Sequence, residues 1–186
     1  MTDKPRQPPC ALIIMGVSGS GKSTIAGKLA ERLHWTCEDG DRFHPKSNVE
    51  KMSAGHPLTD LDRRPWLEAI AAEIDRVGRD GEHAVIACSA LKRAYRDILV
   101  HGRDDVRIVY LKGSRELIAG RLRLRKGHFM PPTLLESQFN TLEEPGASED
   151  PIAVDIDAPV DAIVDHVVDR LQLGSAAEPV PQGSPS

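Results

Sequence analysis

The stretch MGVSGSGKST, residues 15–24, places three glycines, three serines and a lysine between an apolar run and a segment with helical spacing. Residues 16–23 match the pattern G-x-x-x-x-G-K-[ST]. Glycines at such positions let backbone N–H groups turn inward around phosphate oxygens, where a Cβ would clash. The run ALIIM (11–15) predicts a strand before the loop, and TIAGKLAERL (24–33) predicts a helix after it. This strand–loop–helix order predicts a site for a nucleoside triphosphate.

Two side chains of the loop have their own tasks in this interpretation. Lys22 can reach the β- and γ-phosphates, and the Ser23 hydroxyl can ligate Mg²⁺. The free N–H groups and the dipole of the following helix add to the anion site. The expected phosphate site therefore comprises Gly16, Val17, Ser18, Gly19, Ser20, Gly21, Lys22, Ser23 and Thr24.

Length and composition limit the possible classes of protein. The chain has 186 residues, 40% of them hydrophobic and 28% charged, and a net charge of -4. We expect one domain over 1–186, with an ordered core at about 10–173 and a disordered Pro/Gly/Ser-rich tail from Gly174. The negative charge argues against a general nucleic-acid or anionic-membrane binder. No apolar run approaches the roughly 20 residues that cross a bilayer.

The three cysteines, Cys10, Cys37 and Cys88, have no metal-type spacing and cannot all pair within one chain. We therefore expect reduced, buried thiols in a cytoplasmic protein.

Short apolar runs alternate with longer segments of helical spacing along the chain. This alternation predicts an α/β fold with a mostly parallel sheet covered by helices on both faces. With the phosphate loop, it indicates the three-layer sandwich of P-loop nucleoside-triphosphate hydrolases, with five strands. Besides the run before the loop, the expected strands are 35–39, 84–88, 107–111 and 152–156, and the expected helices include 24–33, 66–77, 115–125 and 160–171.

The expected strand 35–39 ends in Glu38-Asp39-Gly40-Asp41. Ligands bind at the carboxyl ends of parallel strands, and we expect this second strand to adjoin the first. One aspartate can orient Mg²⁺ through water while the other accepts a proton from an attacking hydroxyl. The same residues also form common turns. Because the chain lacks a guanine-reading Asn-Lys-x-Asp and leaves about 150 residues after the loop, a small-molecule kinase is favoured.

Several separated segments resemble the gluconate kinases (gluconokinases) of the shikimate-kinase-like P-loop group. The similarity runs from about Ala11 to Leu171 and rests on MGVSGSGKS, DGDRFHPKSNVEKMSAGHPLTDLDRRPWL, CSALKRAYRDIL, VYLKGSRELIAGRLRLRKGHFMPPTLLESQF and LEEPG. It implies transfer of the γ-phosphate of ATP to the 6-hydroxyl of D-gluconate, giving 6-phosphogluconate and ADP, with Mg²⁺, in a cytoplasmic homodimer with a lid. One departure is Leu61, where family members often have an acid.

The resemblance also assigns roles to single residues. Asp39 resembles the metal-side acid and Asp41 the acceptor-side acid. Arg63 resembles an arginine that holds the carboxylate of the acceptor, for which a bidentate guanidinium is well suited. Its neighbour Arg64 could fill that role instead.

Further substrate contacts are expected from two other loops. Ser89 follows the strand 84–88, and its small side chain allows close backbone approach. Lys92 could contact a substrate carboxylate or phosphate, or could be an exposed lysine at a helix start. His44 could bond a gluconate hydroxyl or be a simple loop histidine.

The segment GRLRLRKGHFM resembles a junction between a helix and a lid. Arg121 and Arg125 are four residues apart and share a helix face, which can close over the triphosphate or form a solvated basic surface. Lys126, Gly127 and His128 would begin the lid, with His128 near the substrate. The expected catalytic set is Lys22, Asp41 and Arg125.

Two rival functions remain open at this point. One is another small-molecule kinase of the same group, such as one acting on shikimate. The other is a regulatory protein that closes around ATP without phosphorylating anything, which would turn ATP over slowly without an acceptor.

Overall fold

The computed structural model describes residues 8–124 and 132–172, and these contain a five-stranded parallel sheet. The strands lie in the order β2-β3-β1-β4-β5. Their bounds are β1 (Ala11–Met15), β2 (Thr36–Asp39), β3 (Ala84–Ala87), β4 (Val106–Lys112) and β5 (Ile152–Asp155). The predicted five-stranded parallel sheet is confirmed.

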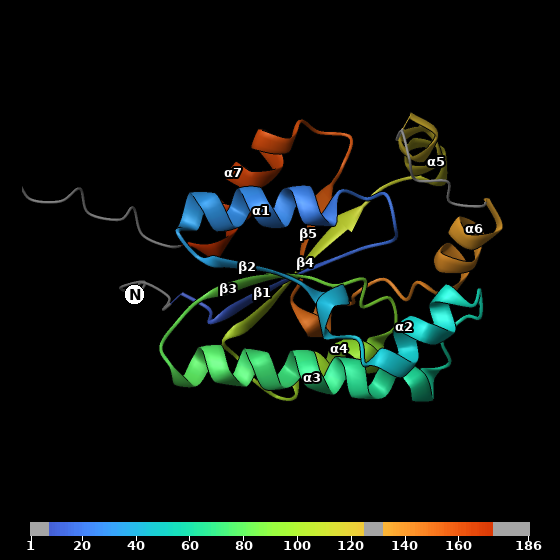
Figure 1. The fold of residues 1–186 in the computed structure, drawn as a ribbon. Helices are drawn as coiled ribbons and strands as arrows, with labels where there is room; N and C mark the ends of the chain where they lie inside the picture. The colour runs from blue at the N-terminus through green and yellow to red at the C-terminus, as the bar shows by residue number, and fades with distance from the viewer. Residues whose placement is uncertain (1–7, 125–131, 173–186) are drawn as a thin grey trace, which may run out of the picture.

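Helices cover both faces of this sheet, as expected. In Figure 1, α1 (Lys22–Leu33) and α7 (Val160–Leu171) lie on one face, and α3 (Asp60–Arg79) and α4 (Arg93–Val100) lie on the other. Three further helices lie beyond the carboxyl ends of the strands: α2 (Lys46–Ser53), α5 (Arg115–Leu124) and α6 (Pro132–Thr141). Two short 3₁₀ turns, η1 (Gly40–Phe43) and η2 (Ala147–Glu149), lie in the connections.

The central strand β1 has a fully buried sequence because helices cover it on both sides. Leu12 and Ile14 pack in the core beneath α1 and α7, whereas Ile13 and Met15 pack in the core above α3 and α4. Successive side chains of a strand point to opposite faces, so one apolar run supplies both cores. The continuous run ALIIM is thus explained by burial on both faces.

The position of β2 differs from the expectation. We expected the second strand to adjoin the first, but β3 lies between them and pairs with both. β2 is therefore an edge strand, and most of its residues are exposed. The same fact overturns the expectation of three buried thiols, because Cys37 lies on β2 and is exposed while Cys10 and Cys88 are buried.

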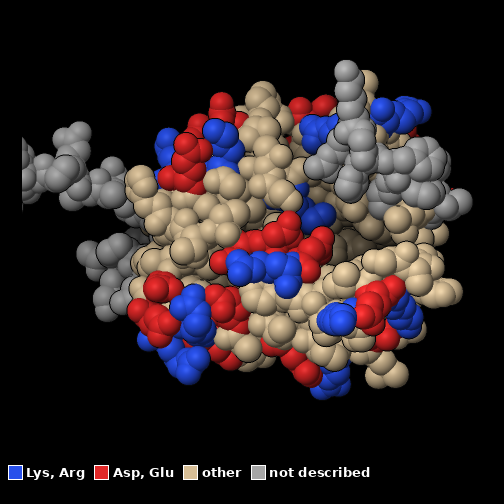
Figure 2. All heavy atoms as spheres, in the orientation of Figure 1, with Lys and Arg blue, Asp and Glu red and all other residues tan. Residues whose placement is uncertain are grey.

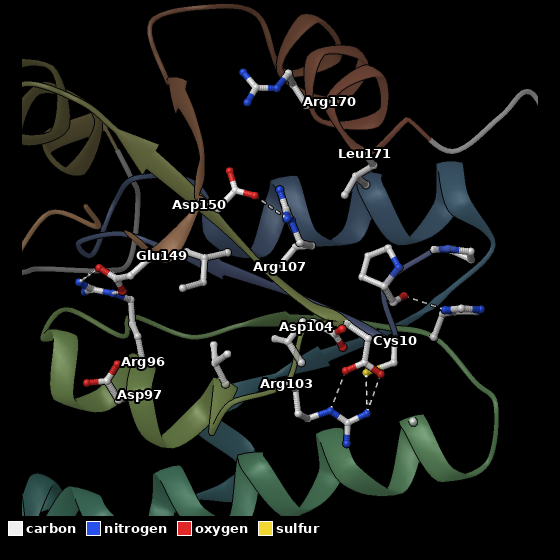
Figure 3. Close-up of a pocket in the computed structure, with 18 of the residues that line it drawn as sticks. Cys10, Arg96, Asp97, Arg103, Asp104, Arg107, Glu149, Asp150, Arg170 and Leu171 are labelled. Carbon is white, nitrogen blue, oxygen red and sulfur yellow. Dashed lines mark hydrogen bonds and ion pairs between the residues drawn. The ribbon is translucent and has the colours of Figure 1, made fainter. Parts of the chain in front are cut away.

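A buried ion pair on the side of α4 holds the loop after β3 in place. Arg96 on α4 is 1% exposed, and its guanidinium donates to the carbonyls of Ala90 (3.0 Å) and Leu91 (3.3 Å). Two further bonds join Arg96 to the Glu149 carboxylate, at 2.6 and 3.1 Å (Figure 3). Ala90 has a positive φ of 44°, a strained conformation for a residue with a Cβ. The surrounding bonds fix this loop in place.

We predict that Glu149→Gln destabilises the fold by about 3 kcal/mol, because it leaves the Arg96 charge buried and uncompensated. The matched control Glu31→Gln removes the exposed partner of Lys28 and should change the free energy of unfolding by less than about 0.5 kcal/mol. Urea unfolding measures both.

The difference in the free energy of unfolding between the wild type and Glu149→Gln should depend on pH. The bonds from Arg96 lower the pKa of Glu149, so the stabilisation is present above the unfolded pKa of about 4.3 and is lost as the pH falls through the native pKa. Equal stability of Glu149→Gln and the wild type at neutral pH would contradict this account.

Candidate active site

The phosphate loop has the backbone shape that its glycines predict. Gly16, Gly19 and Gly21 have φ values of 150°, 82° and 96°. A Cβ on Gly16 would lie 2.8 Å from Ser20 Oγ and 3.0 Å from the carbonyl oxygen of Leu111. Among the described residues Ser20 Oγ is buried with no hydrogen-bond partner. The loop therefore fits a bound phosphate group, which needs backbone N–H groups at close range.

Helix α1 begins at the end of this loop with its first N–H groups free of side-chain caps. Gly21 is the N-cap residue, and no described side chain bonds to the helix start. Lys22 Nζ donates to the carbonyl oxygen of Val17 at 3.1 Å, so the lysine lies along the loop. Ser23 and Thr24 are exposed on the first turn. This arrangement provides N–H donors, a positive helix end and an ammonium group for one polyanion.

The residues expected to bind the phosphate acceptor, here called the acceptor side, begin where β2 ends. A glycine brings them close to the sheet. A Cβ on Gly40 would lie 2.6 Å from the carbonyl oxygen of Ala87, so no other residue fits without moving η1. The indole of Trp66, buried on α3, donates to the Gly40 carbonyl oxygen at 2.7 Å. The Asp-Gly-Asp segment is thus more than a surface turn, since it is fixed to β3 and to α3.

The two aspartates stand on either side of this glycine and are open to solvent. Asp39 accepts a hydrogen bond from the backbone N–H of Asp41 at 3.0 Å and so caps η1. The Asp41 side chain is 86% exposed. Figure 2 shows acidic side chains gathered at the middle of this face, where β2 ends in Figure 1, beside a hollow in the surface. Both carboxylates can therefore meet a ligand.

His44 lies next to Asp41 as a neutral hydrogen-bond donor. Its ring stacks on Trp66, with centroids 4.3 Å apart, and burial is the main cause of its lowered pKa. The amide nitrogen of Asn48 lies 3.3 Å from His44 Nδ1, and an amide nitrogen can only donate. The ring proton is therefore on Nε2, which lies 4.0 Å from the Asp41 carboxylate.

The first turn of α3 separates the two candidate arginines. A capping box between Thr59 and Asp62 fixes the start of this helix. Arg64 donates to Glu68 at 2.8 Å and is exposed. Arg63 is half-buried, and its side chain makes no hydrogen bond or ion pair with any described residue. Of the two, Arg63 is the one available to a ligand.

Lys92 has a protein partner in this structure. Its ammonium bonds both carboxylate oxygens of Asp60, at 2.8 and 2.7 Å, and Tyr95 donates to the same carboxylate at 2.5 Å. These bonds, that of Lys92 first, lower the pKa of Asp60. Ser89 lies closer to the phosphate loop, since its carbonyl oxygen accepts from Gly16 N at 3.4 Å. The loop after β3 therefore connects the phosphate side to the acceptor side.

The expected residues converge on the buried end of β3. Burial raises the pKa of the Cys88 thiol to about 12, so the thiol is protonated. Backbone contacts join the motifs here, since Gly16 of the phosphate loop bonds the Ser89 carbonyl oxygen and Gly40 lies against the carbonyl oxygen of Ala87. The structure thus brings together residues from three separated sequence motifs.

Of the two arginines expected to share a face of the basic helix α5, Arg121 lies within the described residues. Arg121 donates to the carbonyl oxygen of Ile156 at 2.5 Å, next to the loop that follows β5. Arg125 and the expected start of the lid at Lys126, Gly127 and His128 lie outside the described residues.

Sequence reasoning missed two residues that reach the site loops. Gln138 on α6 accepts a hydrogen bond from the Ser18 backbone N–H at 2.7 Å. Glu143, in the segment LEEPG, accepts from Arg93 N at 2.7 Å, and its own N–H donates to the Leu91 carbonyl oxygen. Both lie in segments that carry the family resemblance, LLESQF and LEEPG. Their contacts could not be predicted because each joins parts of the chain that are far apart in sequence.

A cavity of about 760 Å³ lies at the amino ends of the strands, near the residues that precede them (Figure 3). Arginines and acids line it, and several of them pair with each other, such as Arg107 with Asp150 at 2.7 Å and Arg103 with Asp105 at 2.7 Å. Ligands of parallel sheets bind at the carboxyl ends of the strands. The site described above is therefore the better candidate.

Comparison with known proteins agrees with this geometry. A family model described as an AAA domain matches residues 12–145. The thermoresistant gluconokinase of Escherichia coli strain K12 is 45% identical over 163 residues, which cover 87% of this chain and 93% of that protein. The crystal structure of a gluconokinase from Sinorhizobium meliloti 1021 has a TM-score of 0.79 at 42% identity, covering 89% of this chain and 93% of that chain. The chain belongs to the gluconokinase family.

A more distant structure supports the fold of this gluconokinase-family chain. Shikimate kinase from Aquifex aeolicus has a TM-score of 0.54 at 16% identity and covers 87% of this chain and 96% of that chain. At that identity the likeness concerns the P-loop kinase fold alone. Among residues 8–124 and 132–172, no helix is long and apolar enough to cross a membrane.

We predict that Arg63→Ala raises the KM for gluconate about 10–150-fold and leaves the KM for ATP nearly unchanged, because a charge-assisted bond to a carboxylate is lost. Arg64→Ala is the matched control, since that side chain bonds Glu68, and it should change either KM less than about threefold. Initial rates at varied gluconate and ATP measure both. The opposite pattern would assign the role to Arg64.

Proposed function

We propose that this chain transfers the γ-phosphoryl group of ATP to the 6-hydroxyl of D-gluconate, giving 6-phosphogluconate and ADP. The observation that carries the proposal is the meeting of a phosphate loop and two exposed aspartates at the carboxyl ends of the strands, with the first turn of α3, which carries Arg63, joined to the same place through Asn48. Relatives named gluconokinase or probable gluconokinase match this chain at 41–47% identity. Gluconate is a polyol with one carboxylate and one primary hydroxyl, which suits an arginine at one end and an acid at the other.

The phosphate loop would hold the triphosphate through its backbone. The N–H groups of the first turn of α1, which have no side-chain cap, would donate to the phosphate oxygens. Lys22 would exchange its bond to the Val17 carbonyl oxygen for phosphate oxygens and neutralise charge there. Phosphoryl transfer needs positioning and charge neutralisation more than covalent chemistry.

The acceptor side would orient gluconate and remove its proton. Arg63 would bind the carboxylate, and the N–H of His44 Nε2 would donate to a hydroxyl. Asp41 would accept the proton of the attacking hydroxyl, since its exposed carboxylate lies next to that ring. Ser89 and Lys92 would line the same space from the loop after β3.

The residues present fit a magnesium ion bound mainly by water and phosphate. Mg²⁺ takes oxygen ligands and keeps several waters, and the exposed Ser23 hydroxyl and Asp39 carboxylate are both oxygen donors. Among the described residues, no group of three or more His, Cys, Asp or Glu could hold a metal by itself. When bound, Mg²⁺ would supply positive charge to the phosphate oxygens.

Other expectations remain predictions. Arg121 and Arg125 would neutralise phosphate charge, and His128 would approach the substrate. A homodimer, a cytoplasmic location and the lack of nucleic-acid and membrane partners follow from the family resemblance and from composition.

The roles of the two aspartates are distinguished by Asn variants. Asp41→Asn should lower kcat about 10²–10³-fold with gluconate binding retained, because a general base is lost while the loose transition state needs little early deprotonation. Asp39→Asn should also lower kcat, and a higher Mg²⁺ concentration should partly restore it. The measurement is kcat at two Mg²⁺ concentrations, with gluconate binding followed by calorimetry.

Asp104→Asn is the matched control, because Asp104 lies at the amino ends of the strands, and it should leave kcat unchanged. If Asp41→Asn responds to Mg²⁺ and Asp39→Asn does not, the two roles are exchanged. If neither variant changes kcat tenfold, the acid pair has no part in the reaction.

A further inference from the structure

Gln138 on helix α6 makes a hydrogen bond to the phosphate loop. Gln138 Oε1 accepts a hydrogen bond from the backbone N–H of Ser18 at 2.7 Å, across 120 residues of sequence. Its amide nitrogen lies 3.4 Å from Ser18 Oγ, at the outer limit of a hydrogen bond. The carboxamide is therefore held by its oxygen, and its nitrogen keeps donor capacity to spare.

The contact between Gln138 and Ser18 lies next to a contact that Lys22 makes with the loop. Lys22 Nζ, the group that reaches the β- and γ-phosphates in such loops, donates to the carbonyl oxygen of Val17 at 3.1 Å. That carbonyl and the Ser18 N–H belong to the same peptide unit. Gln138 and Lys22 thus bond the same peptide unit of the loop from its opposite sides.

The attachment of α6 does not depend on Gln138. Leu135 is buried in the core beneath α1 and α7, and Phe139 packs against the same core. The Arg115 guanidinium lies 5.2 Å from the centre of the Phe139 ring and bonds Asn140 at 3.2 Å. These neighbours hold the helix in place, so the bond from Gln138 to the phosphate loop is not its only attachment.

We propose that Gln138 is a γ-phosphate contact, in which Oε1 holds the Ser18 N–H and the amide nitrogen donates to a γ-phosphate oxygen. This inference rests on the proposed function, because it assumes that ATP occupies the loop. A neutral donor at this point stabilises ATP but touches nothing in ADP, which lacks the γ-phosphate. Gln138 therefore contributes to the preference for the triphosphate.

Gln138→Glu tests this role, because a carboxylate can still accept from Ser18 N–H but cannot donate and repels phosphate. Calorimetry with the purified chain and Mg²⁺ would compare ADP with a non-hydrolysable ATP analogue. We expect the affinity for the analogue to fall about tenfold or more and the affinity for ADP to change less than about threefold. In kinetics, kcat/KM for ATP should fall while the KM for gluconate stays constant.

The matched control is Asn140→Asp, which makes the same amide-to-carboxylate change two residues further along α6. It keeps an acceptor for Arg115. It should bind both nucleotides as the wild type does. A thermal melt of Gln138→Glu checks that the fold is intact. Gln138→Ala, which removes the donor without adding charge, should show the same selective loss for the analogue.

Three outcomes would overturn the inference. Equal losses for ADP and the analogue would make Gln138 a support for the loop, and unchanged binding of both would remove it from the site. Failure of the wild type to bind either nucleotide would overturn the proposed function with it. If the wild type binds both nucleotides and Lys22→Ala weakens both, the phosphate site stands and only the role of Gln138 is decided by the variant.

Discussion

Two glycines without room for a Cβ set the distance between the sheet and the two halves of the site. At Gly16, a Cβ would collide with Ser20 Oγ and with the carbonyl oxygen of Leu111, so the phosphate loop can close over the end of β1 only with glycine. At Gly40, a Cβ would lie 2.6 Å from the carbonyl oxygen of Ala87, so η1 can lie on the end of β3 only with glycine. Donor and acceptor loops are thereby placed against one rigid edge.

Buried side chains on the helices then hold these loops in position. Trp66 bonds the Gly40 carbonyl oxygen and stacks on His44, while Arg96 bonds the carbonyls of the loop after β3 and pairs with Glu149. Neither Trp66 nor Arg96 is exposed enough to bind substrate. Their effect on catalysis is through geometry, since a small displacement of a reacting group is costly.

Local patterns predicted what depends on neighbouring residues, and they failed where distant residues decide. The glycine-rich loop, the five apolar strands and the helix 160–171 could be predicted, because spacing and burial on both faces leave a direct signature. The edge position of β2, and with it the exposure of Cys37, could not, because strand order depends on pairing across the chain. The contact between Gln138 and Ser18 and the partner of Lys92 were missed for the same reason.

The most direct test of the account is the acceptor specificity of the purified chain. ADP release with ATP and Mg²⁺ would be followed for gluconate, for related sugar acids and for shikimate, and ³¹P NMR would locate the phosphate on the product. The account predicts rapid turnover with gluconate, slow turnover with shikimate, and phosphorus coupled to the two protons of C6. ADP release that is equally slow with and without any acceptor, or a phosphate on another oxygen, would contradict it.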